Sequence, residues 1–238
     1  MRLKKKMNVL RVRDKEMSMF EYSVVYKPFE YAWCMDLVDK HEKGHWGAWE
    51  AKLQEDVNQW KTGGINEIEK NHITQILRLF TQSDCQVGEN YCDLFIPKFK
   101  NNQIRSMLLS FANREVTHQI AYALLNDTLG FPDSEYSAFL EYQELKNKIE
   151  FMKNNDVSSL AGLGKALAQS TCNEGMCLFS AFIMLLNYQR FGKMKGMCEI
   201  VEWSIRDETI HVEGMTKLFR EFCSEHPRII NDKFKASI

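Results

Sequence analysis

The sequence predicts an all-α protein whose four-helix core holds a dinuclear metal site. Three observations indicate this. The 238 residues include only 4 prolines and 12 glycines, and long stretches have helical periodicity. Two of these stretches carry Glu-x-x-His in the middle of an apolar stripe, and two others each carry one embedded acid. A pair of Glu-x-x-His helices facing two carboxylate helices is typical of carboxylate-bridged metal pairs.

The N-terminal third is predicted to support this core. Alternation over Glu21–Tyr26 predicts a short strand or an extended arm, and a helix is expected from Phe29 to about His41. We therefore expect a single domain over residues 1–238, with an N-terminal arm at 1–27 and the core at about 28–225. No composition shift marks a second domain.

The first core helix is expected at about 66–91. Its stripe places Asp84 among Ile73, Ile76, Leu77, Phe80 and Val87. Glu67 and Glu69 follow two glycines and favour the dipole of a first helical turn. We therefore interpret Glu69-x-x-His72 as ordinary surface. Glu42-x-x-His45 lies in an equally charged segment and is interpreted in the same way.

The other core helices are expected at about 99–126, 158–191 and 194–223, with one more helix at about 133–153 after Gly130-Phe-Pro132. Residues three and four positions apart share a helix face, and three such faces can be traced as stripes. Each stripe is apolar at both ends and carries ionisable residues in its middle. The three stripes are Ile104, Leu108, Phe111, Glu115, His118, Tyr122, Leu125; Leu163, Leu167, Thr171, Glu174, Leu178, Phe182, Leu185; and Met197, Val201, Ser204, Glu208, His211, Met215, Leu218, Phe222.

These interruptions predict the metal ligands. A single buried acid can instead be protonated or salt-bridged, but four inward carboxylates with two imidazoles favour ligation. Hard oxygen donors with one nitrogen per metal suit dinuclear iron, with Mn or Mn/Fe as alternatives. The predicted ligand set is Asp84, Glu115, His118, Glu174, Glu208 and His211.

Composition excludes several other classes. The net charge is −1, which does not predict a nucleic-acid or anionic-membrane surface. The apolar stretch from Leu160 to Leu186 contains Lys165 and Glu174, so no membrane span is expected. No Cys-x-x-Cys occurs among the seven cysteines, and we interpret Cys172, Cys177 and Cys198 as reduced, buried residues of a cytoplasmic protein.

Four segments resemble, in order, the metal-helix motifs of the class I ribonucleotide reductase small (beta) subunit, a ferritin-like family. They are Phe80–Asp84, Arg114–Tyr122, Asn173–Met176 and Trp203–His211, within a resemblance over about residues 20–225. The resemblance implies that the metal site oxidises Tyr122 to a radical. The large (alpha) subunit would then use this radical to reduce ribonucleotides to deoxyribonucleotides. It also suggests a homodimer.

The resemblance further implies a relay from His118 through Asp207 to a tryptophan near the N-terminus, Trp46 or its competitor Trp49. Asp207 lies off the ligand stripe, where it can accept a hydrogen bond from a ligand imidazole. Members of the family continue beyond the position of Ile238 with helices and a docking tail. The sequence therefore suggests a truncated or split gene, inactive alone, with a separate chain supplying that segment. Rival interpretations are an R2-like ligand-binding oxidase, another di-iron oxygenase or an iron-storage protein.

Overall fold

A computed structural model describes residues 18–238, except for the side chain at position 81. The part of the N-terminal arm before residue 18 lies outside the described residues. Within 18–238 the chain is helical and contains no strand, so the all-α prediction is confirmed and the strand alternative for Glu21–Tyr26 is wrong. No helix among these residues has the length and apolar character needed to cross a membrane.

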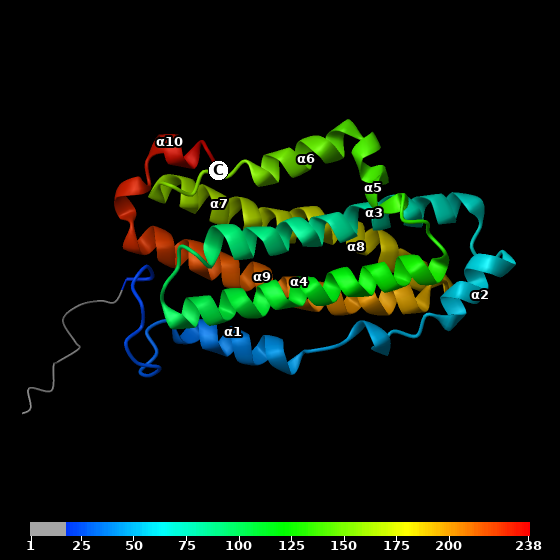
Figure 1. The fold of residues 1–238 in the computed structure, drawn as a ribbon, viewed down its shortest axis with the longest axis horizontal. Helices are drawn as coiled ribbons and strands as arrows, with labels where there is room; N and C mark the ends of the chain where they lie inside the picture. Colours follow the sequence, from blue (N-terminus) through cyan, green and yellow to red (C-terminus); the bar gives the residue numbers. More distant parts are fainter. Residues whose placement is uncertain (1–17) are drawn as a thin grey trace, which may run out of the picture.

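Four long helical rods lie side by side and form the core (Figure 1). They are α3 (Glu67–Glu89), α4 (Asn102–Leu129), the α7–α8 rod (Leu160–Cys172 and Leu178–Leu186) and α9 (Lys195–Glu225). Helix α3 packs on α4, and α7 packs on α9. The predicted stripes of α3, α4 and α9 are all buried, which explains why these amphipathic segments fold as they do.

Shorter elements cover the bundle. Helix α1 (Ala32–Lys43) packs against α4 and α9, while α2 (Gln54–Thr62) lies at one end of the bundle (Figure 1). The predicted helix at 133–153 is instead broken into α5 (Glu135–Ala138), a 3₁₀ turn at Phe139–Glu141 and α6 (Gln143–Lys153). Helix α10 (Asp232–Lys235) follows a 3₁₀ turn at Pro227–Ile229.

Local sequence signals set the helix ends. Asn66 caps α3 in a reciprocal arrangement with Glu69, and Asn101 caps α4. Gly130 ends α4 in the left-handed region, with φ at 84°. At the start of α9, the carboxylate of Asp56 accepts hydrogen bonds from the backbone N–H groups of Gly196 and Met197, at 3.0 and 2.6 Å.

Two π-helical segments interrupt the α-helical pattern, at Asn90–Phe95 and Asn173–Cys177. The second segment splits the predicted helix at 158–191, so its predicted face is only partly correct. Ser170, not Thr171, is buried beside Glu174, and Cys172 and Cys177 are exposed, contrary to our interpretation of them as buried. One extra residue per turn rotates the side chains that follow it, and such segments are frequent at functional sites.

Candidate metal centre

Six ionisable side chains converge at the middle of the bundle, where a packed apolar core would normally exclude charge. Each is at most 2% exposed. They come from all four rods: Asp84 from α3, Glu115 and His118 from α4, Glu174 from the π-helical segment, and Glu208 and His211 from α9. The structure thus brings together the complete set of ligands that the stripes predict.

Both imidazoles turn Nδ1 towards the carboxylates. His211 Nδ1 lies 3.1 Å from Glu115 Oε1 and 3.4 Å from both Glu174 Oε2 and Glu208 Oε2. His118 Nδ1 lies 3.3 Å from Glu208 Oε1 and 3.8 Å from Glu115 Oε2. Each histidine therefore has one ring nitrogen available to the carboxylate cluster and one that points away from it.

The donors form two overlapping groups. Ligand atoms of Glu115, Glu174, Glu208 and His211 lie within 4.8 Å of one another, and so do those of Asp84, Glu115 and His118. Glu115 belongs to both groups, and its two oxygens face different histidines. Glu115 would therefore be able to serve both halves of a dinuclear centre.

The residues fit a dinuclear metal centre because several of their polar atoms lack hydrogen-bond partners. Among the described residues no hydrogen bond reaches Asp84 Oδ2, His211 Nδ1 or either side-chain oxygen of Glu115 and Glu208. Buried oxygens and nitrogens without partners are costly unless a cation binds them. The donor set, four carboxylates and two imidazoles, matches the preferences of iron and manganese.

The electrostatics of the cluster also favour cations. Burial, and then the charge of Glu115, raise the pKa of Asp84 well above its ordinary value. Burial acts to lower the pKa of His118 and of His211, but the surrounding carboxylates outweigh burial and raise both. Positive charge is therefore strongly stabilised here, whether it is carried by protons or by metal ions.

Glu174 is held by two further side chains. The hydroxyl of Tyr91 donates to its Oε2 at 2.7 Å, and Ser170 Oγ donates to its Oε1 at 2.9 Å. Burial raises the pKa of Tyr91, and the charge of Glu174 adds to this effect, so the phenol stays protonated and donates. Tyr91 was not predicted as a functional residue, because its π-helical segment has no sequence signature.

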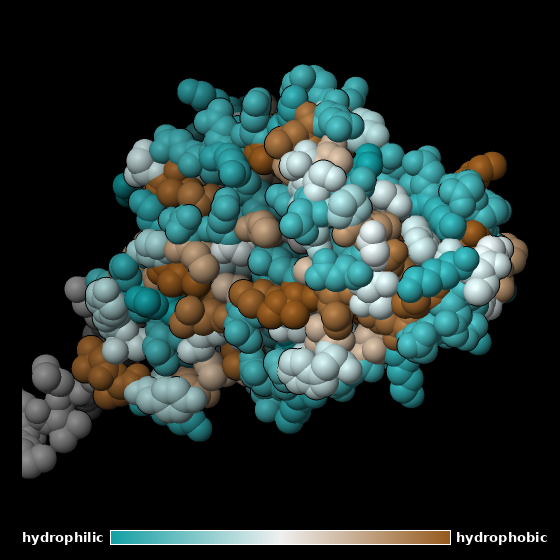
Figure 2. Space-filling model, turned by 45° about the vertical axis from the view of Figure 1, so that its right-hand side comes forward, coloured by the Kyte–Doolittle hydropathy of each residue, from teal (hydrophilic) through white to brown (hydrophobic). Residues whose placement is uncertain are grey.

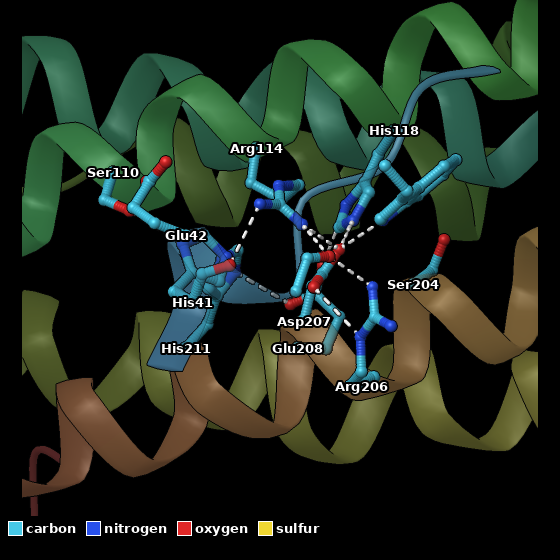
Figure 3. A network of polar contacts seen from close by, with 12 residues as sticks. His41, Glu42, Ser110, Arg114, His118, Ser204, Arg206, Asp207, Glu208 and His211 are labelled. Carbon is cyan, nitrogen blue, oxygen red and sulfur yellow. Dashed lines mark hydrogen bonds and ion pairs between the residues drawn. The ribbon is translucent and has the colours of Figure 1, made fainter. Parts of the chain in front are cut away.

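The outward nitrogen of His118 meets Asp207. Nε2 donates to Asp207 Oδ2 over 3.3 Å, and the same oxygen accepts from Trp46 Nε1 at 2.7 Å and from Arg114 at 2.9 Å (Figure 3). Burial acts to raise the pKa of Asp207, but the hydrogen bonds from His118 and Trp46 and the charge of Arg114 hold it below its ordinary value. Asp207 is therefore a buried carboxylate anion with three donors.

The position of the tryptophans separates the two competitors. Trp46 is 3% exposed, and its ring centroid lies 5.9 Å from that of His118, whereas Trp49 is 80% exposed.

Arg114 was not predicted as a functional residue, yet it is buried and also donates to the backbone carbonyls of His41 and Gly44, at 3.2 Å each. It thereby holds the end of α1 against the site.

The outward nitrogen of His211 meets a residue that sequence reasoning missed. Its Nε2 lies 3.2 Å from Nε2 of His41, which is fully buried on α1 (Figure 3). Burial, together with the positive charges of His211 and Arg114, lowers the pKa of His41 to about 2, so its imidazole is neutral. A single histidine in a charged segment has no periodic signal that could have marked it.

Tyr122 is buried in the apolar core beside the cluster. It is 1% exposed, and its ring stacks on that of Phe80, with the centroids 5.0 Å apart. Its hydroxyl donates to Ser204 Oγ at 3.1 Å. Burial, and then the charge of Asp84, raise its pKa well above the ordinary value. Tyr122 is therefore a neutral phenol at the edge of the carboxylate cluster.

The two other Glu-x-x-His pairs contribute none of the six converging side chains. Glu69 and His72 lie at the start of α3, where Glu69 binds Lys193 and His72 is within 2.9 Å of the Tyr188 hydroxyl. Neither Glu69 nor His72 belongs to a group of described residues that could hold a metal ion.

Fold and site together define a carboxylate-ligated dinuclear metal protein built on a four-helix core.

Comparison with known proteins identifies the family. The chain belongs to the ribonucleotide reductase small-chain family, whose model matches residues 23–238. It is 40% identical over 225 residues to the probable ribonucleoside-diphosphate reductase small subunit of Invertebrate iridescent virus 6, covering 88% of this chain. It is 25% identical to the ribonucleoside-diphosphate reductase subunit beta of Chlamydia pneumoniae, covering 89% of this chain. The chain spans 62% and 65% of the lengths of these two relatives.

Solved structures share the fold. The ribonucleotide reductase R2 subunit from Clostridium botulinum matches with a TM-score of 0.80 at 22% identity, over 87% of this chain and 67% of that one. The dimanganese(II) NrdF of Streptococcus sanguinis has a TM-score of 0.78 at 19% identity, over 91% and 76%. An R2-like ligand-binding oxidase from Sulfolobus acidocaldarius has a TM-score of 0.71 at 22% identity, over 90% and 84%. At such identities these likenesses show the ferritin-like R2 fold alone.

Proposed function

We propose that this protein generates and stores the radical of a class I ribonucleoside-diphosphate reductase. In this proposal Asp84, Glu115, His118, Glu174, Glu208 and His211 hold a dinuclear iron centre, or one containing manganese. The observation that carries the proposal is the position of Tyr122, a buried phenol beside a cluster of two imidazoles and four carboxylates. A bound metal pair would supply the oxidising power that such a site needs.

Tyr122 is proposed to be the residue that is oxidised. The phenol would give one electron to the bound metal pair and its hydroxyl proton to the neighbouring carboxylate cluster. The resulting radical is protected because Phe80 stacks on the Tyr122 ring and Phe182 stacks on Phe80. Ser204 Oγ, which accepts the hydroxyl hydrogen bond, holds the phenol in one orientation. The burial of Tyr122, which is 1% exposed, supports a long-lived radical because it keeps bulk solvent from the ring.

The chain His118–Asp207–Trp46 is proposed to carry the oxidising equivalent towards a large subunit. Its support is the pair of hydrogen bonds that meet at Asp207 Oδ2, one from each ring. Arg114 and the buried Asp207 anion keep the two rings in fixed orientation.

We also propose a cytoplasmic location. Its support is that all seven cysteines, each in the described part of the chain, have free thiols.

We also propose a homodimer. The outer face of α4 presents an apolar stripe of half-exposed side chains, a pattern that commonly marks an interface. The stripe consists of Leu109, Val116, Ile120 and Leu124. Apolar groups also gather in a band across the face of the molecule seen in Figure 2. Replacing Ile120 by Glu should shift the protein to monomer in analytical ultracentrifugation.

The reaction itself gives the decisive test. The metal-loaded protein is mixed with a ribonucleotide reductase large subunit and a ribonucleoside diphosphate. Formation of deoxyribonucleotide that requires both proteins and is lost in Tyr122→Phe would support the proposal. Turnover that persists in Tyr122→Phe would move the radical to another residue, whereas oxidation of an added apolar substrate without any large subunit would favour the ligand-binding oxidase alternative.

A further inference from the structure

The two ligand histidines are supported in different ways on their outward side. His118 donates directly to a buried carboxylate, Asp207. Among residues 18–238 no carboxylate binds Nε2 of His211, which instead faces the imidazole of His41 at 3.2 Å. A ligand imidazole needs a partner at its second nitrogen, because that hydrogen bond fixes both the tautomer and the ring orientation.

A chain of hydrogen bonds continues from His41 to the surface. His41 Nδ1 lies 2.7 Å from Ser110 Oγ, and the Ser110 hydroxyl donates to Glu42 Oε1 at 2.6 Å (Figure 3). Glu42 is exposed, while His41 is fully buried and Ser110 is 9% exposed. The segment that appeared to be ordinary surface thus ends in a buried contact with a candidate metal ligand.

The directions of these bonds follow from their ends. Nδ1 of His211 faces the carboxylate cluster, and when it serves as a metal ligand its Nε2 carries the hydrogen and donates to His41 Nε2. His41 then carries its own hydrogen on Nδ1 and donates to Ser110. Ser110 donates in turn to the Glu42 carboxylate, which can only accept. In all three hydrogen bonds the donor is therefore the residue nearer the metal centre, and the acceptor is the residue nearer the surface.

We propose that His41 is a positioning residue that fixes the tautomer and the ring orientation of His211, with Ser110 and Glu42 holding His41 in place. The inference rests on the proposed metal centre, and it assigns to α1, which provides no ligand, a part in building that centre. The ring of Phe111 lies edge-on to His41, at 5.3 Å between centroids, and limits rotation of its imidazole. The proposal predicts that the metal position served by His211 depends on His41, whereas the position served by His118 does not.

The test uses Mn(II), whose free ion gives an electron paramagnetic resonance signal that disappears on binding. His41→Leu keeps a similar volume but cannot accept the hydrogen bond. It should weaken one of the two bound Mn(II) ions by about 10–100-fold and leave the other unchanged. His41→Gln, whose amide can accept from His211 and donate to Ser110, should restore binding to within about threefold. Lys43→Gln, on the exposed face of the same helix, is the control and should bind like the parent protein.

Different outcomes separate the two proposals. A parent protein that binds no Mn(II) would overturn the metal centre and this inference together. A parent that binds two ions, with a folded His41→Leu variant that binds both equally well or weakens both alike, would overturn the role of His41 alone. If His41→Leu does not fold, Ser110→Ala carries the test, because it removes the acceptor of His41 Nδ1 outside the ligand cluster. Unchanged binding in Ser110→Ala would then contradict the proposal.

Discussion

The indole of Trp46 donates a 2.7 Å hydrogen bond to Oδ2 of Asp207, the same oxygen that accepts from the ligand histidine His118. The two partners are 161 positions apart in the chain, so only the packing of the segment after α1 against α9 brings them together. Asp207 is held as an anion by these bonds and by Arg114. A single carboxylate oxygen thus joins the candidate metal centre to the outer layer of the bundle.

This relationship predicts that Trp46→Phe blocks electron transfer without disturbing the metals. Phenylalanine keeps the aromatic packing but cannot donate to Asp207. Deoxyribonucleotide formation with a large subunit should fall at least about a hundredfold, the scale of a lost essential group, while metal content and the Tyr122 signal stay intact. Trp49→Phe is the matched control because Trp49 is 80% exposed, and it should retain activity. Equal losses in both variants would mean that the segment matters for docking instead of transfer.

Metal binding can be tested without a partner. Because two Glu-x-x-His pairs, Asp84 and Glu174 supply ligands for a metal pair, the parent protein should bind about two iron ions per chain. Glu174→Ala and His211→Ala should each reduce this number, measured by colorimetric iron analysis after desalting. His72→Ala should not change it, because His72 lies at the exposed start of α3. Full metal content in both ligand variants would place the metals elsewhere.

The radical prediction separates two buried tyrosines. After aerobic iron loading, an electron paramagnetic resonance signal of tyrosyl type should appear and fall to background in Tyr122→Phe, with iron content preserved. Tyr91 is equally buried and touches Glu174, so Tyr91→Phe is a stringent comparison and should keep the signal. A signal lost in Tyr91→Phe and kept in Tyr122→Phe would move the radical site to the other side of the cluster.

How far the sequence predicts this site depends on whether a residue belongs to a helical stripe. The six candidate ligands, and the position of Tyr122 on the same face, follow from spacings of three and four, because an apolar face interrupted by charge is visible in one dimension. The radical role of Tyr122 is instead what the family resemblance implies. Arg114 and Ser204 lie in the same segments but gain their roles only from partners on other helices. His41 has no periodic context at all, and its contact with His211 depends on how α1 packs.

The π-helical segment at Asn173–Cys177 marks a second limit. Its sequence is compatible with a continuous α-helix, so helical periodicity predicts a continuous rod with Thr171 on the inner face, and the apolar composition of the segment suggests that Cys172 and Cys177 are buried. The i→i+5 hydrogen bonding changes the faces of the residues around it, and Ser170 is buried while both cysteines are exposed. Glu174 is nevertheless buried, as the stripe of a continuous α-helix predicts.

Glu69, whose pair with His72 we interpret as surface, links the start of α3 to the segment before α9. Its carboxylate caps Asn66 at the start of α3 and accepts hydrogen bonds from Lys193, just before α9, at 2.6 and 2.8 Å. The hydrogen bond from Lys193, and then that from Asn66, lower the pKa of Glu69 below its ordinary value. A depressed folded-state pKa means that this stabilisation is present above the unfolded pKa of about 4.3 and is lost as the pH falls through the folded value.

Glu69→Gln should therefore destabilise the protein by about 1 kcal/mol at pH 7, a shift of about 2–4 °C in the melting temperature. The difference from the parent should shrink as the pH is lowered from 5 towards 3, because the parent then loses the same charge. Glu67→Gln is the control, since its partner Lys70 is one turn away on the same helix and the Glu67 side chain is 88% exposed. Thermal unfolding followed by circular dichroism at several pH values measures the effect. A pH-independent difference would show that the loss comes from packing and not from the carboxylate charge.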